Sequence, residues 1–273
     1  MYRGERRVDL KESVENNIKL SDTKSVGKTL AILSNFNEST PVQKTSDIAS
    51  KLDMSISTVS RHLNTMLDWG YLERDNVTGF YSPGYKMIAI AGAALLNNDA
   101  YRYSYPELHR LSYRYTVHSH MAMPDGVDIV HLISSSCENT MDLFIPMGHR
   151  QPMYCSAMGR AMLAYLPENE VKKILQKSEL SKLTSETKID IEEIKKELIK
   201  TRKKGYCVLI NELIENKASL AAPIFNRNRI PVAAISVSTS TRGIKIPERE
   251  MELVKAVKGA AGRISGRLGY FPR

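Results

Sequence analysis

The chain has 273 residues, of which 42 % are hydrophobic and 25 % charged, a composition typical of a globular protein of about two domains. Its longest apolar run, residues 87–96, is far shorter than the roughly 18 residues that span a bilayer, and its polar N-terminus lacks the apolar segment of a signal peptide. The three cysteines are too scattered for a disulfide framework, so membrane, secreted and disordered classes are disfavoured and we expect a cytoplasmic protein.

The net charge of +9 is unevenly distributed along the chain. Residues 1–85 contain eleven basic and eleven acidic side chains, whereas residues 172–205 contain eleven and six, and residues 245–273 contain seven and three. Both basic stretches have the apolar spacing of amphipathic helices, such as 190–204, which Gly205 ends. A mixed-sign helix surface is usually only solvent-exposed, so the charge alone does not identify a nucleic-acid-binding segment.

The N-terminal third has the order of elements of a winged helix-turn-helix. We expect residues 1–22 to be a flexible arm and residues 23–85 to form a domain. Its helices are predicted at about 22–37, after Thr45 (as N-cap) and at 56–69, with a tight turn at 53–55 between the last two. A hairpin with strands at 71–74 and 80–82 follows, in the place of a wing.

The exposed face of the third predicted helix carries small hydroxyl and amide side chains and one arginine, with no acidic residue before Asp68. Such a face offers short donors for phosphate oxygens and a bidentate group for base edges. We therefore predict a DNA-binding surface formed by Thr45, Ser55, Ser57, Thr58, Ser60, Arg61, Asn64, Arg74, Asn76 and Thr78. Arg61 is the expected base or phosphate contact in the major groove, and the wing residues would hold flanking phosphate.

The C-terminal two thirds are predicted to follow an apolar linker helix within residues 86–100 and to form an α/β domain over 101–273. Helices are expected at 105–115, 156–176, 190–204 and within 245–273, and strands at 119–123, 128–133, 141–145, 206–210, 217–224 and 232–238. Ser156 to Gly159 opens a helix, and the unpaired amides and positive dipole end of such a turn suit a carboxylate.

Several different short motifs follow one another along the chain in a specific order and spacing. They lie at 25–30, 57–61, 70–72 and 79–81 in the first part, and at 148–152, 156–164, 205–206, Glu212 and 220–224 in the second. Together they resemble the IclR family of bacterial transcription regulators, over about residues 23–268. The resemblance implies an α+β fold, with a winged helix-turn-helix domain, a linker helix and a C-terminal effector-binding domain similar to GAF and PAS folds. It also implies homodimers or homotetramers that bind imperfect inverted repeats in double-stranded DNA, with a small organic acid or sugar-derived carboxylate as effector.

The same resemblance implies the residues of an effector site. They are the backbone amides of Ala157 and Met158, together with Ser219, which stands where many relatives have Cys, and Ser236 and Ser238 on one face of the last strand. Leu209 departs from the family pattern, because many relatives have Asp there, so a more apolar ligand end is expected. The alternative is that these are an ordinary helix cap and ordinary strand serines.

We therefore expect a ligand-responsive regulator without catalytic activity, cofactor or metal; a repressor of a catabolic operon is favoured over an activator. A metal-responsive regulator is the alternative, because imidazole and thiolate groups suit zinc although their spacing matches no compact motif. The groups within 40 residues of one another are His118, His120, His131, His149, Cys137 and Cys155. A small-molecule enzyme with Cys155 as nucleophile is less favoured, since no orienting group or oxyanion site is visible.

Overall fold

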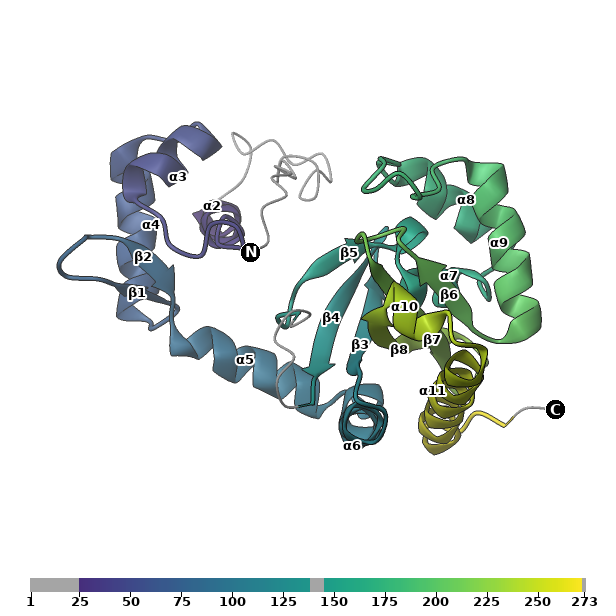
Figure 1. Cartoon of the computed structure of the whole chain (residues 1–273). Coiled ribbons are helices and arrows are strands. Elements are labelled where there is room, and N and C mark those ends of the chain that lie inside the picture. The colour runs from purple at the N-terminus through teal and green to yellow at the C-terminus, as the bar shows by residue number, and fades with distance from the viewer. Residues whose placement is uncertain (1–24, 138–144, 272–273) are drawn as a thin grey trace. The chain divides into compact units, whose positions relative to one another are not determined.

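The computed structural model describes residues 25–137 and 145–271 (Figure 1). The chain divides into two compact units, the first ending at Ala94 and the second beginning at Leu95. This division lies inside helix α5, Tyr85–Leu96. The predicted arm, residues 1–22, and all but the last residue of the predicted strand 141–145 lie outside the described residues. Within the described ranges, no helix has the length and apolar character needed to cross a membrane.

Before α5, the described residues of the first unit form the helices α2 Ser25–Leu33, α3 Thr45–Leu52 and α4 Ile56–Asp68, followed by a hairpin of β1 Leu72–Arg74 and β2 Tyr81–Pro83. Apolar residues spaced three and four apart on α4 (Val59, Leu63 and Met66) are buried in one core with Ile32 of α2 and Ile48 of α3. A helix-turn-helix followed by a hairpin is the predicted winged helix-turn-helix, and the prediction is confirmed.

Two helix ends in this unit differ from the prediction. Thr45 is not an N-cap, because Lys44 has the extended backbone of the cap position and Thr45 is already the first helical residue. Helix α2 ends at Leu33 rather than near residue 37, because the Asn37 side chain accepts two backbone amides of the following turn, at 3.0 and 3.1 Å. Ser55 does cap its helix, since its hydroxyl accepts an amide of the first turn of α4 at 3.2 Å.

The second unit is an α/β domain on a six-stranded antiparallel sheet, in the order β5-β4-β3-β8-β7-β6. Its strands are β3 His118–Asp125, β4 Asp128–Ser135, β5 Arg150–Pro152, β6 Cys207–Ile210, β7 Lys217–Phe225 and β8 Pro231–Ser240. Its helices are α6 Asp99–Tyr115, α7 Ala157–Leu163, α8 Glu168–Lys177, α9 Ile191–Lys204, α10 Thr241–Ile244 and α11 Pro247–Arg267. Strand β5 and helix α10 were not predicted from the sequence.

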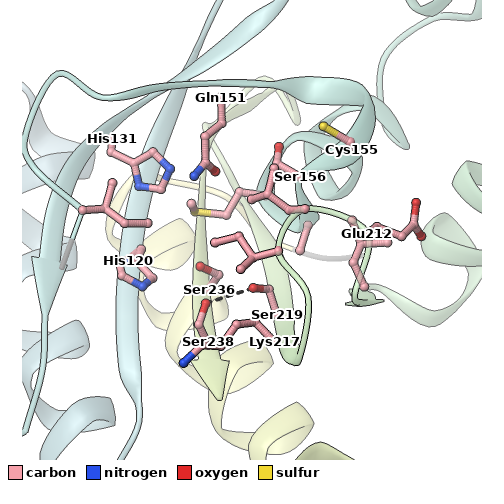
Figure 2. Close-up of a pocket in the computed structure, with 16 residues that line it drawn as sticks. His120, His131, Gln151, Cys155, Ser156, Glu212, Lys217, Ser219, Ser236 and Ser238 are labelled. Atoms are coloured by element: carbon pink, nitrogen blue, oxygen red, sulfur yellow. Dashed lines mark hydrogen bonds between the residues drawn. The ribbon is translucent and has the colours of Figure 1, made fainter. Parts of the chain in front are cut away.

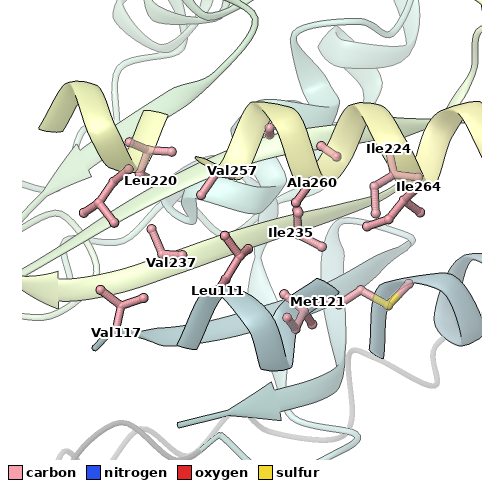
Figure 3. Close-up of a cluster of buried hydrophobic side chains, with 14 of the residues drawn as sticks. Leu111, Val117, Met121, Leu220, Ile224, Ile235, Val237, Val257, Ala260 and Ile264 are labelled. Atoms are coloured by element: carbon pink, nitrogen blue, oxygen red, sulfur yellow. The ribbon is translucent and has the colours of Figure 1, made fainter. Parts of the chain in front are cut away.

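Helices cover both faces of this sheet, so a hydrophobic core lies on each side. Helices α6 and α11 pack on one face, against Ile235 and Val237 of β8 among others (Figure 3). Helices α7, α8 and α9 form the other core, which includes Ala234 of the same strand. Because side chains alternate across a strand, Ser236 and Ser238 share the α7 side with Ala234. That alternation places two polar groups beneath α7.

Two helix predictions in this unit need correction. Helix α6 begins at Asp99 rather than at about residue 105, because Asn98 caps it by accepting a first-turn amide at 3.0 Å. The predicted helix 156–176 is two helices, α7 and α8. Pro167 is the N-cap of α8, and its ring and missing N–H disfavour a continuous helix through this point.

Candidate functional site

The exposed side of α4 and the hairpin form the first candidate surface. Seven of the ten predicted DNA contacts are exposed (Ser55, Ser57, Arg61, Asn64, Arg74, Asn76 and Thr78), and Thr45, Thr58 and Ser60 are half-buried. The hydroxyl of Ser55 lies 2.7 Å from that of Thr58 and 3.2 Å from that of Ser57, so these three groups form one cluster at the start of α4. Arg61 enters none of the arginine ion pairs found in residues 25–137 and 145–271, which leaves its guanidinium available to an external acceptor.

The tip of the hairpin holds a fixed negative charge. The carboxylate of Asp75 accepts hydrogen bonds from the amide and hydroxyl of Thr78, at 2.6 and 2.9 Å, and these bonds lower the pKa of Asp75 below its ordinary value. A DNA phosphate beside Thr78 would therefore be repelled by the Asp75 carboxylate. The guanidinium of Arg74 lies over the Tyr81 ring, 5.6 Å from its centroid, and is the better placed cation of the hairpin.

His62 is a buried polar residue of α4 that the sequence reasoning missed. Its Nδ1 lies 2.8 Å from the hydroxyl of Thr29 on α2, so this contact ties the two helices together. Burial, with the charges of Arg61 and Lys28, lowers the pKa of His62 and favours its neutral form. The sequence feature that could have predicted the burial of His62 is its position next to Leu63, on the apolar face of the helix.

The second candidate site is a pocket on the α7 side of the sheet (Figure 2). Its cavity volume is about 50 Å³, which is room for a few water molecules. All six residues expected at the effector site line it, namely Ala157, Met158, Leu209, Ser219, Ser236 and Ser238. Further polar residues that were not predicted for this site also line it, namely His120, His131, Gln151, Ser156, Glu212 and Lys217.

The sheet supplies the polar floor of this pocket. Ser219 of β7 lies opposite Ser238 of β8, and their hydroxyls are 2.9 Å apart. His120 of β3 lies opposite Ser236 of β8. Leu209 is buried and offers only apolar surface. The floor therefore combines hydroxyl and imidazole groups with an apolar wall.

The start of α7 forms the opposite wall. Ser156 caps this helix, with its hydroxyl accepting the amide of Gly159 at 3.2 Å. The next two amides, of Ala157 and Met158, have no acceptor within a helix that starts here. A Cβ atom at Gly159 would overlap the backbone of Met153, so only glycine allows this close approach. Helix α7 has seven residues, which limits its dipole, so the amides themselves are the useful feature.

A buried ion pair joins the walls of the pocket. Arg160 of α7 makes two hydrogen bonds to Glu212, in the loop between β6 and β7, at 2.9 and 2.6 Å. The third guanidinium position, Nε, donates to the carbonyl of Tyr154 at 2.6 Å. The sequence motifs included both Arg160 and Glu212, but their pairing over more than fifty positions had no local signal.

His120 is fully buried at the edge of the pocket. Its Nδ1 lies 3.0 Å from the hydroxyl of Ser134, and its Nε2 is a buried atom without a hydrogen-bond partner. Burial, followed by the charges of His131 and His118, lowers the pKa of His120 to about 3. The ring is therefore neutral at physiological pH.

The rival chemistries receive little support from this geometry. Burial raises the pKa of the Cys155 thiol to about 12, so it remains protonated and is a poor nucleophile near neutral pH. The rings of His120 and His131 lie 5.9 Å apart, and those of His131 and His149 lie 5.7 Å apart. Even so, the described residues contain no group of three or more His, Cys, Asp or Glu side chains with the geometry of a metal site.

Comparison with known proteins gives matches over nearly the whole chain. The sequence profile of the IclR helix-turn-helix domain matches residues 25–76, and that of the bacterial transcriptional regulator IclR C-terminal region matches residues 92–266. The HTH-type transcriptional regulator KdgR of Escherichia coli is 30% identical over 90% of this chain and 93% of its own length. The HTH-type transcriptional repressor AllR of Klebsiella pneumoniae is 26% identical over 89% of each chain.

The fold has the same relatives. The crystal structure of an IclR transcriptional regulator from Alicyclobacillus acidocaldarius superposes with a TM-score of 0.81, at 25% identity, over 90% of this chain and 98% of that one. Two family profiles in the expected order, together with a relative at 30% identity, agree with the winged helix-turn-helix and the α/β domain described above. The chain belongs to the IclR family of transcriptional regulators.

Proposed function

We propose that this chain is a ligand-responsive DNA-binding regulator whose second unit binds a small organic acid. The observation that carries the proposal is that one pocket contains, in its lining, all six residues expected at the effector site, from α7, β6, β7 and β8. Small-molecule sites are concave, mostly apolar, and have a few converging polar groups, which describes this pocket.

The first unit would bind double-stranded DNA through α4. An exposed face of hydroxyl and amide groups around Arg61 suits phosphate and base edges. Arg74 and Asn76 of the hairpin would contact flanking phosphate, and Lys44, which lies 4.8 Å from the centroid of the Phe80 ring, adds a cation beside them. The operator would be an imperfect inverted repeat, because a symmetric dimer presents two such helices.

Helix α5 supports the proposal of a homodimer. None of its twelve residues is buried, although it is mostly apolar, and Tyr85 is 77 % exposed and Ile88 66 %. A contiguous exposed apolar surface of this kind marks an interaction site. A second copy of the chain is the partner that the inverted-repeat operator requires, and pairing of two dimers would form a tetramer.

Ligand binding would act by shifting an equilibrium between dimer geometries that differ in the spacing of the two α4 helices. The repressor role is proposed from the name of the relative AllR, which is a transcriptional repressor. A carboxylate would be held by the amides at the start of α7 and by the serine hydroxyls of β7 and β8. The regulated genes would be those that metabolise the acid, in the cytoplasm where the DNA lies.

The experiment is a selection of fragmented genomic DNA on the purified protein, repeated with a panel of small organic acids. We expect a few specific fragments to be retained, and one acid to change their retention. The double variant Ser236→Ala with Ser238→Ala should retain the same fragments and lose the response to the acid. Failure of the wild-type protein to retain any specific fragment would refute the proposal, and an unaltered response in the double variant would refute the pocket assignment.

A further inference from the structure

Among the described residues that line the pocket, Lys217 is a cation that no acidic side chain balances. Lys217 and Glu212 are its two lining residues with acidic or strongly basic side chains. Glu212 is neutralised by its buried pairing with Arg160, at 2.6 Å. Lys217 is half-buried and takes no part in the lysine ion pairs of the described ranges. The described lining of the pocket therefore has an excess positive charge at Lys217.

The imidazole of His120 adds a hydrogen-bond donor to the same region. The hydroxyl of Ser134 lies 3.0 Å from Nδ1 of His120, and its oxygen also accepts the amide of Ile145 at 3.4 Å, an arrangement in which the hydroxyl can donate to Nδ1. A neutral ring that accepts at Nδ1 carries its own hydrogen on Nε2. Nε2 is buried without a partner, and a buried donor with no acceptor is unfavourable. A ligand oxygen would satisfy it.

The strand register places these groups along β8 and on its two neighbouring strands, β7 and β3. Lys217 and Ser219 are two residues apart on β7 and so share a face, and Ser219 lies opposite Ser238. Lys217 lies opposite Ser240 of β8, and His120, on the other neighbour of β8, lies opposite Ser236. Figure 2 shows Lys217 and Ser238 at one end of the pocket and Ser156, at the start of α7, at the other.

We infer that Lys217 binds a second anionic group of the ligand, with His120 as a further polar contact, so that the effector of this chain is a small dicarboxylate. The inference rests on the proposed function, since it requires a ligand in this pocket. An ammonium group forms a charge-assisted hydrogen bond with a carboxylate, and an imidazole nitrogen without a partner offers a further polar contact to the ligand. Leu209 and Met158 also line the pocket, and their apolar side chains suit a short aliphatic spacer. The small cavity favours a short chain.

The test measures binding of two matched ligand series to the full-length protein by calorimetry at fixed ionic strength. One series is the linear dicarboxylates from malonate to adipate, and the other is the monocarboxylates of equal carbon number. Lys217→Met and His120→Phe are the test variants. Lys173→Met, which removes an exposed cation of α8 outside the pocket, is the matched control. Circular dichroism and the melting temperature verify that each variant is folded.

We expect at least one dicarboxylate to bind about tenfold or more tightly than its monocarboxylate partner, because one charge-assisted contact is lost in the latter. Lys217→Met should abolish this preference, His120→Phe should reduce it, and Lys173→Met should leave it unchanged. Equal binding of both series, or a preference that survives Lys217→Met, would overturn the inference while leaving the proposed function intact. If no dicarboxylate binds at millimolar concentration, the inference of a dicarboxylate effector is also wrong. The proposed function is then tested separately, by whether the protein retains specific genomic DNA.

Discussion

Arg160 and Glu212 form a two-point ion pair in the interior of the second unit, with hydrogen bonds of 2.9 and 2.6 Å and side chains that are 0 % and 7 % exposed. The pair connects the first turn of α7 to the loop between β6 and β7, and Glu212 also accepts the backbone amide of Lys188 at 3.3 Å. Because residues from both of these segments line the pocket, the pair holds its walls at a defined separation.

Breaking this pair should strongly destabilise the second unit. Arg160→Met or Glu212→Gln leaves a buried charge or polar group without its partner, at a cost of about 3 kcal/mol or more in the free energy of unfolding. The double variant Arg160→Met with Glu212→Met should recover part of that loss. The free energy of unfolding is measured by urea unfolding, monitored by circular dichroism. Arg102→Met is the control, since Arg102 pairs with Asp99 in an exposed position. Single variants as stable as the control would show that the pair is unimportant.

His120 should make the second unit less stable in acid. Its pKa falls from an ordinary value of 6.5 to about 3 in the folded chain, mainly through burial. Protons therefore bind the unfolded chain first, so this contribution to stability is complete above pH 6.5 and is lost as the pH falls toward 3. The loss between about pH 7.5 and pH 5 is roughly 2 kcal/mol for this group alone. His120→Gln should flatten the dependence measured by urea unfolding across this range, and an unchanged slope would contradict the assignment.

Helix α5 should control the association of chains. Ile88→Asp places a charge in its exposed apolar surface, so the dimer should dissociate to monomers at concentrations where the wild-type chain is associated. Sedimentation velocity measures this. Ile199→Asp on α9 is the matched control, because Ile199 is 70 % exposed and lies outside α5. Equal sedimentation of the two variants would place the dimer contact elsewhere.

The elements with strong local signals were predictable from the sequence. Asp53 has a φ of 52° in the turn before α4, where the sequence predicted a residue that tolerates the left-handed conformation. Gly205 ends α9 with a φ of 81°, as its position after a basic helix end indicated. Thr45 failed as a cap because the backbone becomes helical one residue earlier than the hydroxyl pattern suggested. Local propensity therefore predicts the type of an element more reliably than the residue at which the element begins.

The pocket was only partly predictable. Ser236 and Ser238 share a face because strands alternate, so their common orientation follows from the sequence alone. The pairing of Arg160 with Glu212 and the presence of Lys217 and His120 in the pocket lining depend on the order of strands in the sheet, which no local pattern contains. His120 was considered as a metal ligand, and the sheet instead places it at the pocket edge against Ser134.

The central claim is that α4 binds DNA through Arg61. Its most direct test is the Kd of the retained genomic fragment, measured by fluorescence anisotropy for the wild-type chain and for Arg61→Ala. Arg242→Ala, which removes an exposed arginine of α10, is the matched control. We predict that Arg61→Ala raises the Kd by about tenfold or more with no loss of folding, because one bidentate arginine contact contributes about 1–3 kcal/mol, and that Arg242→Ala leaves the Kd unchanged. An unchanged Kd for Arg61→Ala would contradict the account.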